Sequence, residues 1–98
     1  MQASEFVAKA IKDKAFLVEV CKHIPEEYLQ EQDIDQDNLG ALMNHYFYDA
    51  ARDMGYEFDA DEFKSECERQ INSLNNLKKT RYIFRFFKSL RKAGRGKK

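Results

Sequence analysis

The chain has 98 residues, of which 43% are apolar and 35% are charged, with one proline, four glycines and no tryptophan. This composition argues against disorder and favours one small helical domain with a modest core. The formal net charge is zero, but the charges are segregated. Residues 1–77 hold 7 basic and 17 acidic side chains (−10), and residues 78–98 hold 10 basic and no acidic ones (+10). Such a segregation indicates a partner or an internal docking contact.

A first helix is expected over residues 4–23, with Ser4 as its N-cap. Its apolar positions recur at helical spacing and are Phe6, Ala10, Leu17, Val20, Cys21 and Ile24. Pro25 ends the helix, because the residue before a proline disfavours the helical region. Charged side chains interrupt the apolar positions of residues 1–14, so this stretch does not resemble a secretory signal, and no segment approaches the roughly 18 apolar residues of a membrane span. The expected location is the cytoplasm.

The segment that follows is expected to be largely irregular. A short helical turn is predicted over residues 25–32, and a loop over residues 33–38. Three aspartates of this loop match the first acidic positions of a calcium-binding EF-hand. However, Asn38 stands where the turn glycine belongs, and Asn44 replaces the bidentate glutamate. Helix capping explains these aspartates better than calcium binding does.

The residues that could support chemistry form no recognisable reactive site. His45, Asp49 and Asp53 recur every four residues and could hold a divalent ion, but their place beside the core-facing stripe favours ordinary surface roles. Cys21 and Cys67 lie on apolar stripes outside any CxxC motif, which predicts buried free thiols. Neither a nucleophile–base pair nor a phosphate-binding loop is present. We therefore expect no metal, no cofactor, no small-molecule substrate and no catalytic activity.

A second long helix is expected over residues 38–54. Its apolar stripe consists of Leu39, Leu42, Met43, Tyr46, Phe47, Ala50 and Met54. Gly55 suits the left-handed position that commonly follows a helix. Asp59 stands three residues before Glu62, the spacing of an acidic capping box, and this predicts that the next helix starts directly after Asp59.

The last part of the chain carries two apolar faces. One consists of Phe63, Cys67, Ile71, Leu74 and Leu77, and the other consists of Ile83, Phe86, Phe87 and Leu90. They lie roughly 170° apart on a helix, so one straight helix cannot bury both against the same core. The pattern has two explanations. Either the chain turns or kinks near residues 75–80, or one continuous helix packs its end elsewhere. In both cases residues 80–92 are expected to be a separately oriented element. The expected fold is all-α: a small domain of three to four helices, with an acidic helical region (1–77) and a basic amphipathic C-terminal helix and tail (78–98).

The basic C-terminal helix is the strongest candidate for a binding site. Opposite its apolar face lie Arg81, Arg85, Lys88 and Lys92. Such a helix could lie on an anionic membrane, or bind nucleic-acid phosphates while Tyr82 and Phe84 stack on bases. It could also present its apolar face to a protein groove. In a fourth interpretation, the apolar face completes the core of this domain, and the basic face is solvated or meets the acidic helices.

Residues 50–63, AARDMGYEFDADEF, resemble the end of the Nif11-like domains. In that family a helix ends in Gly-Tyr, followed by an aromatic residue and then by a capping residue before Glu and an apolar residue. These places are occupied here by Gly55, Tyr56, Phe58, Asp59, Glu62 and Phe63, and the amino-terminal part fits through Phe6, Asp13, Phe16 and Leu17. The resemblance implies a bacterial, helical recognition module of the kind that a peptide-modifying enzyme grips when it matures a ribosomally made peptide.

The chain departs from such a leader in its C-terminal part. No Gly-Gly or Gly-Ala cleavage pair follows the fourth helix, and residues 78–98 contain no cysteine and only Thr80 and Ser89 as hydroxyl residues. The expected function is a non-catalytic protein-binding module without an evident modifiable core peptide. Nucleic-acid or anionic-membrane binding through the basic helix is the alternative. The expected partner-binding residues are Tyr56, Phe58, Arg81, Arg85, Phe86, Phe87, Lys88, Leu90 and Lys92.

Overall fold

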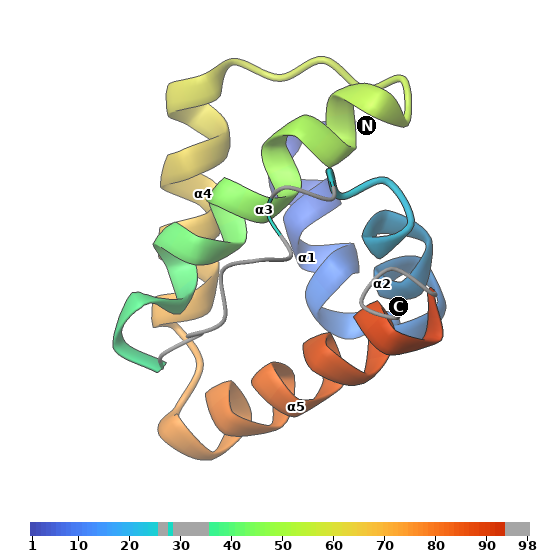
Figure 1. Ribbon diagram of the computed structural model, residues 1–98. Helices are drawn as coiled ribbons and strands as arrows, with labels where there is room; N and C mark the ends of the chain where they lie inside the picture. Colours follow the sequence, from blue (N-terminus) through green and yellow to red (C-terminus); the bar gives the residue numbers. More distant parts are fainter. Residues whose placement is uncertain (26–27, 29–35, 94–98) are drawn as a thin grey trace.

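The computed structural model describes residues 1–25, 28 and 36–93, and in this part of the chain helices are joined by short turns (Figure 1). It contains no strand, so the all-α prediction is confirmed, with five α-helices in place of three or four. Their bounds are α1 Ala3–Lys12, α2 Lys14–Cys21, α3 Leu39–Asp53, α4 Ala60–Asn72 and α5 Asn76–Lys92, and a short 3-10 turn, η2, spans Gln36–Asn38. None of these helices has the length and apolar character that a membrane span requires.

The prediction of one continuous first helix is wrong, because the chain breaks at Asp13. The Asp13 backbone is extended, with φ −109° and ψ 109°. Its Oδ1 accepts the backbone N–H groups of Ala15 (3.0 Å) and Phe16 (3.3 Å). A short carboxylate that binds nearby N–H groups competes with the helical hydrogen bonds, and here it ends α1 and caps α2. The break separates the two helices, so that α1 packs on α4 while α2 packs on α5.

Replacing Asp13 by alanine is therefore expected to destabilise the domain. The first turn of α2 loses its acceptor, which costs about 0.5–2 kcal/mol of unfolding free energy. Urea denaturation followed by circular dichroism measures this loss. Asp13→Asn is the matched control, because asparagine caps a helix about as well as aspartate. Equal losses in the two variants would show that the negative charge, and not the cap, is what matters at this position.

The segment between α3 and α4 behaves as the sequence predicts. Gly55 has φ +98°, its N–H donates to the Arg52 carbonyl, and the Tyr56 N–H donates to the Ala51 carbonyl, both at 3.0 Å. This pair of hydrogen bonds is a Schellman motif, which requires a left-handed residue after the helix. Asp59 Oδ2 then accepts the Glu62 N–H at 3.0 Å and starts α4.

Helices α3 and α4 pack closely along one side of the molecule (Figure 1). Gly40, in the first turn of α3, makes this approach possible. A Cβ atom built on Gly40 would lie 2.9 Å from the Glu68 Cα, closer than real Cβ atoms come to a backbone. The glycine that weakens the helix locally is thus required by tertiary packing.

A turn does separate the last two apolar faces, but it lies at residues 73–75, earlier than the predicted 75–80, and the last helix begins before residue 80. Helix α4 ends at Asn72, and Asn75 Oδ1 accepts the Lys78 N–H at 2.8 Å to cap α5. Leu77 therefore does not extend the apolar face of α4. It lies in the first turn of α5, where 62% of its surface is exposed.

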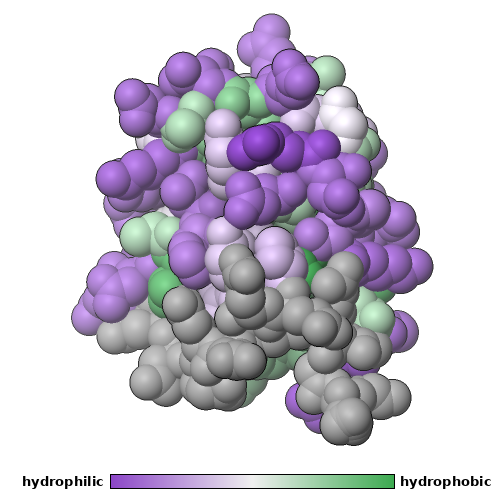
Figure 2. Space-filling view, turned by 45° about the horizontal axis from the view of Figure 1, so that its top comes forward, coloured by the Kyte–Doolittle hydropathy of each residue, from purple (hydrophilic) through white to green (hydrophobic). Residues whose placement is uncertain are grey.

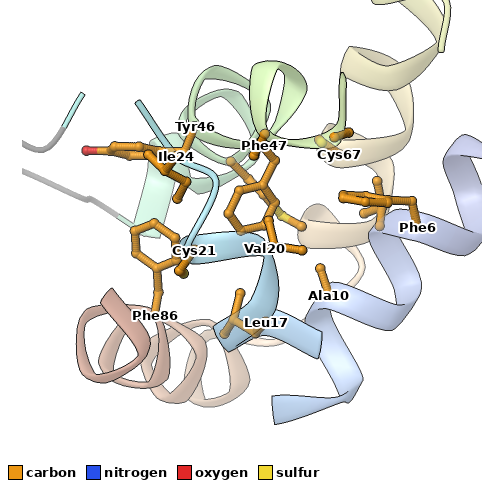
Figure 3. Close-up of a cluster of buried hydrophobic side chains, with 14 of the residues drawn as sticks. Phe6, Ala10, Leu17, Val20, Cys21, Ile24, Tyr46, Phe47, Cys67 and Phe86 are labelled. Carbon is orange, nitrogen blue, oxygen red and sulfur yellow. The ribbon is translucent and has the colours of Figure 1, made fainter. Parts of the chain in front are cut away.

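Helix α5 packs on α2 with a face that differs from the predicted one. Its buried residues are Tyr82, Phe86 and Ser89, whereas Phe87 is 37% exposed. Figure 3 shows Phe86 pointing from α5 into the core beside Cys21 and Ile24. Its ring also lies 5.3 Å from the Tyr46 ring and 5.7 Å from the Phe47 ring, between centroids. Of the alternatives for this helix, the described chain adopts the one in which α5 completes the domain's own core.

Candidate binding surface on helix α5

The outer side of α5 and the start of α2 together form a shallow basic hollow. It is lined by Lys14, Arg81, Phe84, Arg85 and Lys88. Arg81, Arg85 and Lys88 are predicted site residues, and the structure brings them together. Lys14 was missed, because only the packing of α2 on α5 places it there. The hollow thus gathers four cationic side chains from two helices around one phenyl ring.

Exposed apolar side chains concentrate on the same helix. In the described part of the chain, the large apolar residues that stay exposed are Met1, Leu77 (62%), Phe84 (69%) and Phe87 (37%). Three of these four belong to α5, so they are not scattered at random over the surface. The α5 outer surface is defined here as Lys14, Leu77, Arg81, Phe84, Arg85, Phe87, Lys88, Arg91 and Lys92.

Another face of the molecule has a different character. The face shown in Figure 2 is turned toward the top of Figure 1, and α5 runs along the bottom of that view. Hydrophilic side chains dominate the coloured part of this face, and apolar ones form small separate patches (Figure 2). The exposed apolar residues of α5 therefore contrast with the coloured part of this face.

Arg85 differs from the other cations because it also holds the fold together. One of its guanidinium nitrogens donates to the Ile11 carbonyl near the C-terminal end of α1. The guanidinium also lies 6.0 Å from the centre of the Tyr82 ring. A cation at a helix C-terminus interacts favourably with the helix dipole. Arg85 thus fixes α5 against the α1–α2 junction and positions one side of the hollow.

The remaining cations of the hollow keep their charge available. Within the described ranges, no acidic side chain lies at ion-pair distance from Lys14, Arg81 or Lys88; the ion pairs found there join other residues. Asp13, the acidic neighbour of Lys14, is engaged as the cap of α2. Among the described residues, these three cations therefore have no ion-pair partner.

The other predicted site residues lie in four different environments. Phe86 is in the core, Leu90 is half-buried beside it, and Lys92 is exposed at the end of α5. Tyr56 and Phe58 lie at the opposite side of the core, each with its ring 5.6 Å from the ring of Phe6. The rings of Tyr56 and Phe58 are parallel and partly exposed, so both residues combine a structural role with some accessible surface.

The groups with potential reactivity are buried or paired. Both cysteines are buried thiols outside any disulfide, as predicted, and burial raises the pKa of the Cys67 thiol to about 12. Burial likewise raises the pKa of the Tyr82 hydroxyl well above its usual value. His23 Nδ1 lies 2.5 Å from Asp53 Oδ2, and the Tyr28 hydroxyl donates to Asp49 at 2.7 Å. These pairs connect structural elements, and the described residues contain no group of three or more metal-ligating side chains.

Comparison of the chain with protein-family models, with curated protein sequences and with solved structures finds no match. Function therefore has to be argued from the geometry and charge of the molecule. The feature that stands out on those grounds is the α5 outer surface, where positive charge and exposed aromatic groups coincide.

Proposed function

We propose that this chain is a small non-catalytic binding module that attaches to a phosphate-bearing anionic partner through the α5 outer surface. One observation carries the proposal: four cationic side chains from α2 and α5 line one hollow together with the exposed ring of Phe84. Lysine and arginine side chains bind phosphate oxygens through charge-assisted hydrogen bonds. The exposed ring adds apolar contact at the centre of the charged area.

The charge distribution of the chain supports an oriented attachment. Residues 1–77 carry a net charge of −10 and residues 78–98 carry +10. An anionic partner is repelled by the acidic region and attracted by α5, so the molecule approaches with one face forward. A chain of zero net charge gains this orientation only because its charges are segregated.

Binding of the full chain to inorganic polyphosphate tests the proposal. Each phosphate that a cation neutralises releases counterions, so affinity should fall steeply as salt rises. The double variant Arg81→Glu/Lys88→Glu should weaken binding and lower the slope of log K against log salt by about two. Fluorescence anisotropy of the labelled chain measures both quantities.

The control is Lys22→Glu/Lys64→Glu, which changes the net charge equally at exposed positions outside the α5 outer surface. It should retain most of the affinity. Equal loss in the control would show that net charge, and not this surface, governs binding. Absence of binding by the unmodified chain at low salt would refute the proposal.

A second candidate function is recognition by a protein partner. The resemblance of residues 50–63 to Nif11-like domains favours it, together with the parallel, partly exposed rings of Tyr56 and Phe58, whose centres lie 6.1 Å apart. On this proposal, a bacterial peptide-modifying enzyme grips the module at these rings. Titration of the labelled chain with an enzyme that recognises Nif11-like leaders tests it. Saturable binding that Tyr56→Leu weakens without unfolding the domain supports this function, and absence of binding contradicts it.

A further inference from the structure

We infer that the partner of the α5 outer surface is a bilayer that contains anionic lipids, on which α5 lies parallel to the membrane plane. This inference rests on the proposed function and names the source of the phosphate groups. It depends on the apolar residues of the surface, which phosphate binding alone does not explain.

The exposed apolar side chains form a row along one side of α5. At 100° per residue, Leu77 and Phe84 point within roughly 20° of each other, and Phe87 lies roughly 60° from Phe84. Their rise along the helix axis extends over about 15 Å. With 62%, 69% and 37% of their surfaces exposed, these side chains can enter the boundary between headgroups and acyl chains together.

The basic residues flank this row in the way that an interfacial helix requires. Arg81 and Lys88 project roughly 40–60° to one side of Phe84, and Arg91 continues the row itself. All three are exposed. Long cationic side chains can extend to the phosphate layer while their stems cover apolar surface. The same helix side therefore offers apolar insertion and headgroup contact.

The composition of the surface distinguishes a membrane from other anionic partners. Single-stranded nucleic acid would stack on Phe84, but it would leave the exposed Leu77 without a function. Protein interfaces are depleted in lysine, whereas Lys14, Lys88 and Lys92 all belong to this surface. Lysine is common where proteins meet anionic lipids, because its charge needs no fixed geometry.

The fold leaves the α5 outer surface accessible to a flat bilayer. Helix α5 forms one edge of the molecule in Figure 1, and its opposite side is anchored on α2 by Phe86. No acidic residue follows Glu68 in the chain, so α5 itself carries no carboxylate that would repel lipid phosphates. Docking through α5 requires no unfolding of the described helices, because this surface is already exposed.

Flotation of the full chain with lipid vesicles tests the inference. One set of vesicles is phosphatidylcholine alone, and the other is a mixture of phosphatidylcholine and phosphatidylglycerol. We expect binding to the mixed vesicles only. Leu77→Ser/Phe84→Ser should lower the partition coefficient by at least about tenfold, because apolar surface no longer enters the bilayer. The same variant should lose much less of its affinity for polyphosphate than of its affinity for vesicles, because phosphate binding depends mainly on charge, whereas Arg81→Glu/Lys88→Glu should lose both activities.

The outcomes separate this inference from the proposed function. Polyphosphate binding without vesicle binding would overturn the inference and leave the proposed function intact. Equal vesicle binding by the unmodified chain and by Leu77→Ser/Phe84→Ser would also overturn it, because attachment would then be electrostatic alone. A single-stranded oligonucleotide that binds more tightly than vesicles, and depends on Phe84 but not on Leu77, would replace the bilayer by nucleic acid. Failure of both probes would refute the proposed function as well.

Discussion

Phe86→Ala is expected to lower the free energy of unfolding by about 3–5 kcal/mol, the usual cost of emptying a buried phenylalanine site. Only 3% of the Phe86 surface is exposed, and its ring contacts those of Tyr46 and Phe47. The substitution therefore leaves a cavity between α5, α2 and α3. Because small domains are stable by only about 5–15 kcal/mol, much of the total stability should be lost. Urea denaturation followed by circular dichroism gives the value.

Two other phenylalanines on α5 provide graded controls. Phe87 is 37% exposed and Phe84 is 69% exposed. Phe87→Ala should cost about 1 kcal/mol, and Phe84→Ala should stay within about 0.5 kcal/mol of the unmodified chain. A reversed order, with Phe87→Ala the most costly, would mean that α5 packs in the rotation that periodicity predicts and not in the one that the structure shows.

Phe6→Ala is expected to have a comparable effect at the other side of the core, again about 3–5 kcal/mol. Phe6 is fully buried, and its ring centre lies 5.3–5.8 Å from four other rings. These rings belong to Phe16, Tyr56, Phe58 and Phe63. Removing the central ring deprives the segment between α3 and α4 of its anchor in α1. Urea denaturation measures the loss, and the near-ultraviolet dichroism of tyrosine reports whether Tyr56 loses its fixed environment.

Phe6→Leu serves as the control for this prediction. Leucine preserves most of the buried apolar volume but not the edge-on contacts between rings, which contribute about 0.5–1.5 kcal/mol for each pair. We expect a loss between those of the unmodified chain and of Phe6→Ala. A change below about 1 kcal/mol in Phe6→Ala would show that the aromatic cluster does not hold this segment in place.

Several helix ends could be predicted from the sequence, because they depend on local chemistry. The left-handed Gly55, the Asp59 cap and the turn before α5 each involve side chains and backbone groups a few residues apart. The stretch that resembles Nif11-like domains contains two of these signals, and its aromatic residues are structural anchors of the described fold. What this stretch has in common with those domains is therefore local structure: the end of one helix, the start of the next and the aromatic residues between them.

The missed break at Asp13 shows where periodicity misleads. The apolar positions on either side of Asp13 continue at helical spacing, so the pattern predicts one helix. The carboxylate nevertheless stops the first helix and caps the second. An aspartate between two lysines gives little warning of this, because the same pattern also suits an exposed position in a helix. The break matters, since it turns α2 toward α5 and brings Lys14 to the binding surface.

By itself, the sequence determined the helical class, the main ends of the middle helices and the segregation of charge, because these follow from composition and from contacts between near neighbours. Only the tertiary structure decided the rotation of α5 about its axis. That helix carries apolar residues over more than half of its circumference, so periodicity allows more than one buried face. Packing against α2 and α3 selects the face with Tyr82 and Phe86. The same packing leaves Leu77 and Phe84 exposed among the cations and assembles the surface that we propose binds anionic lipid.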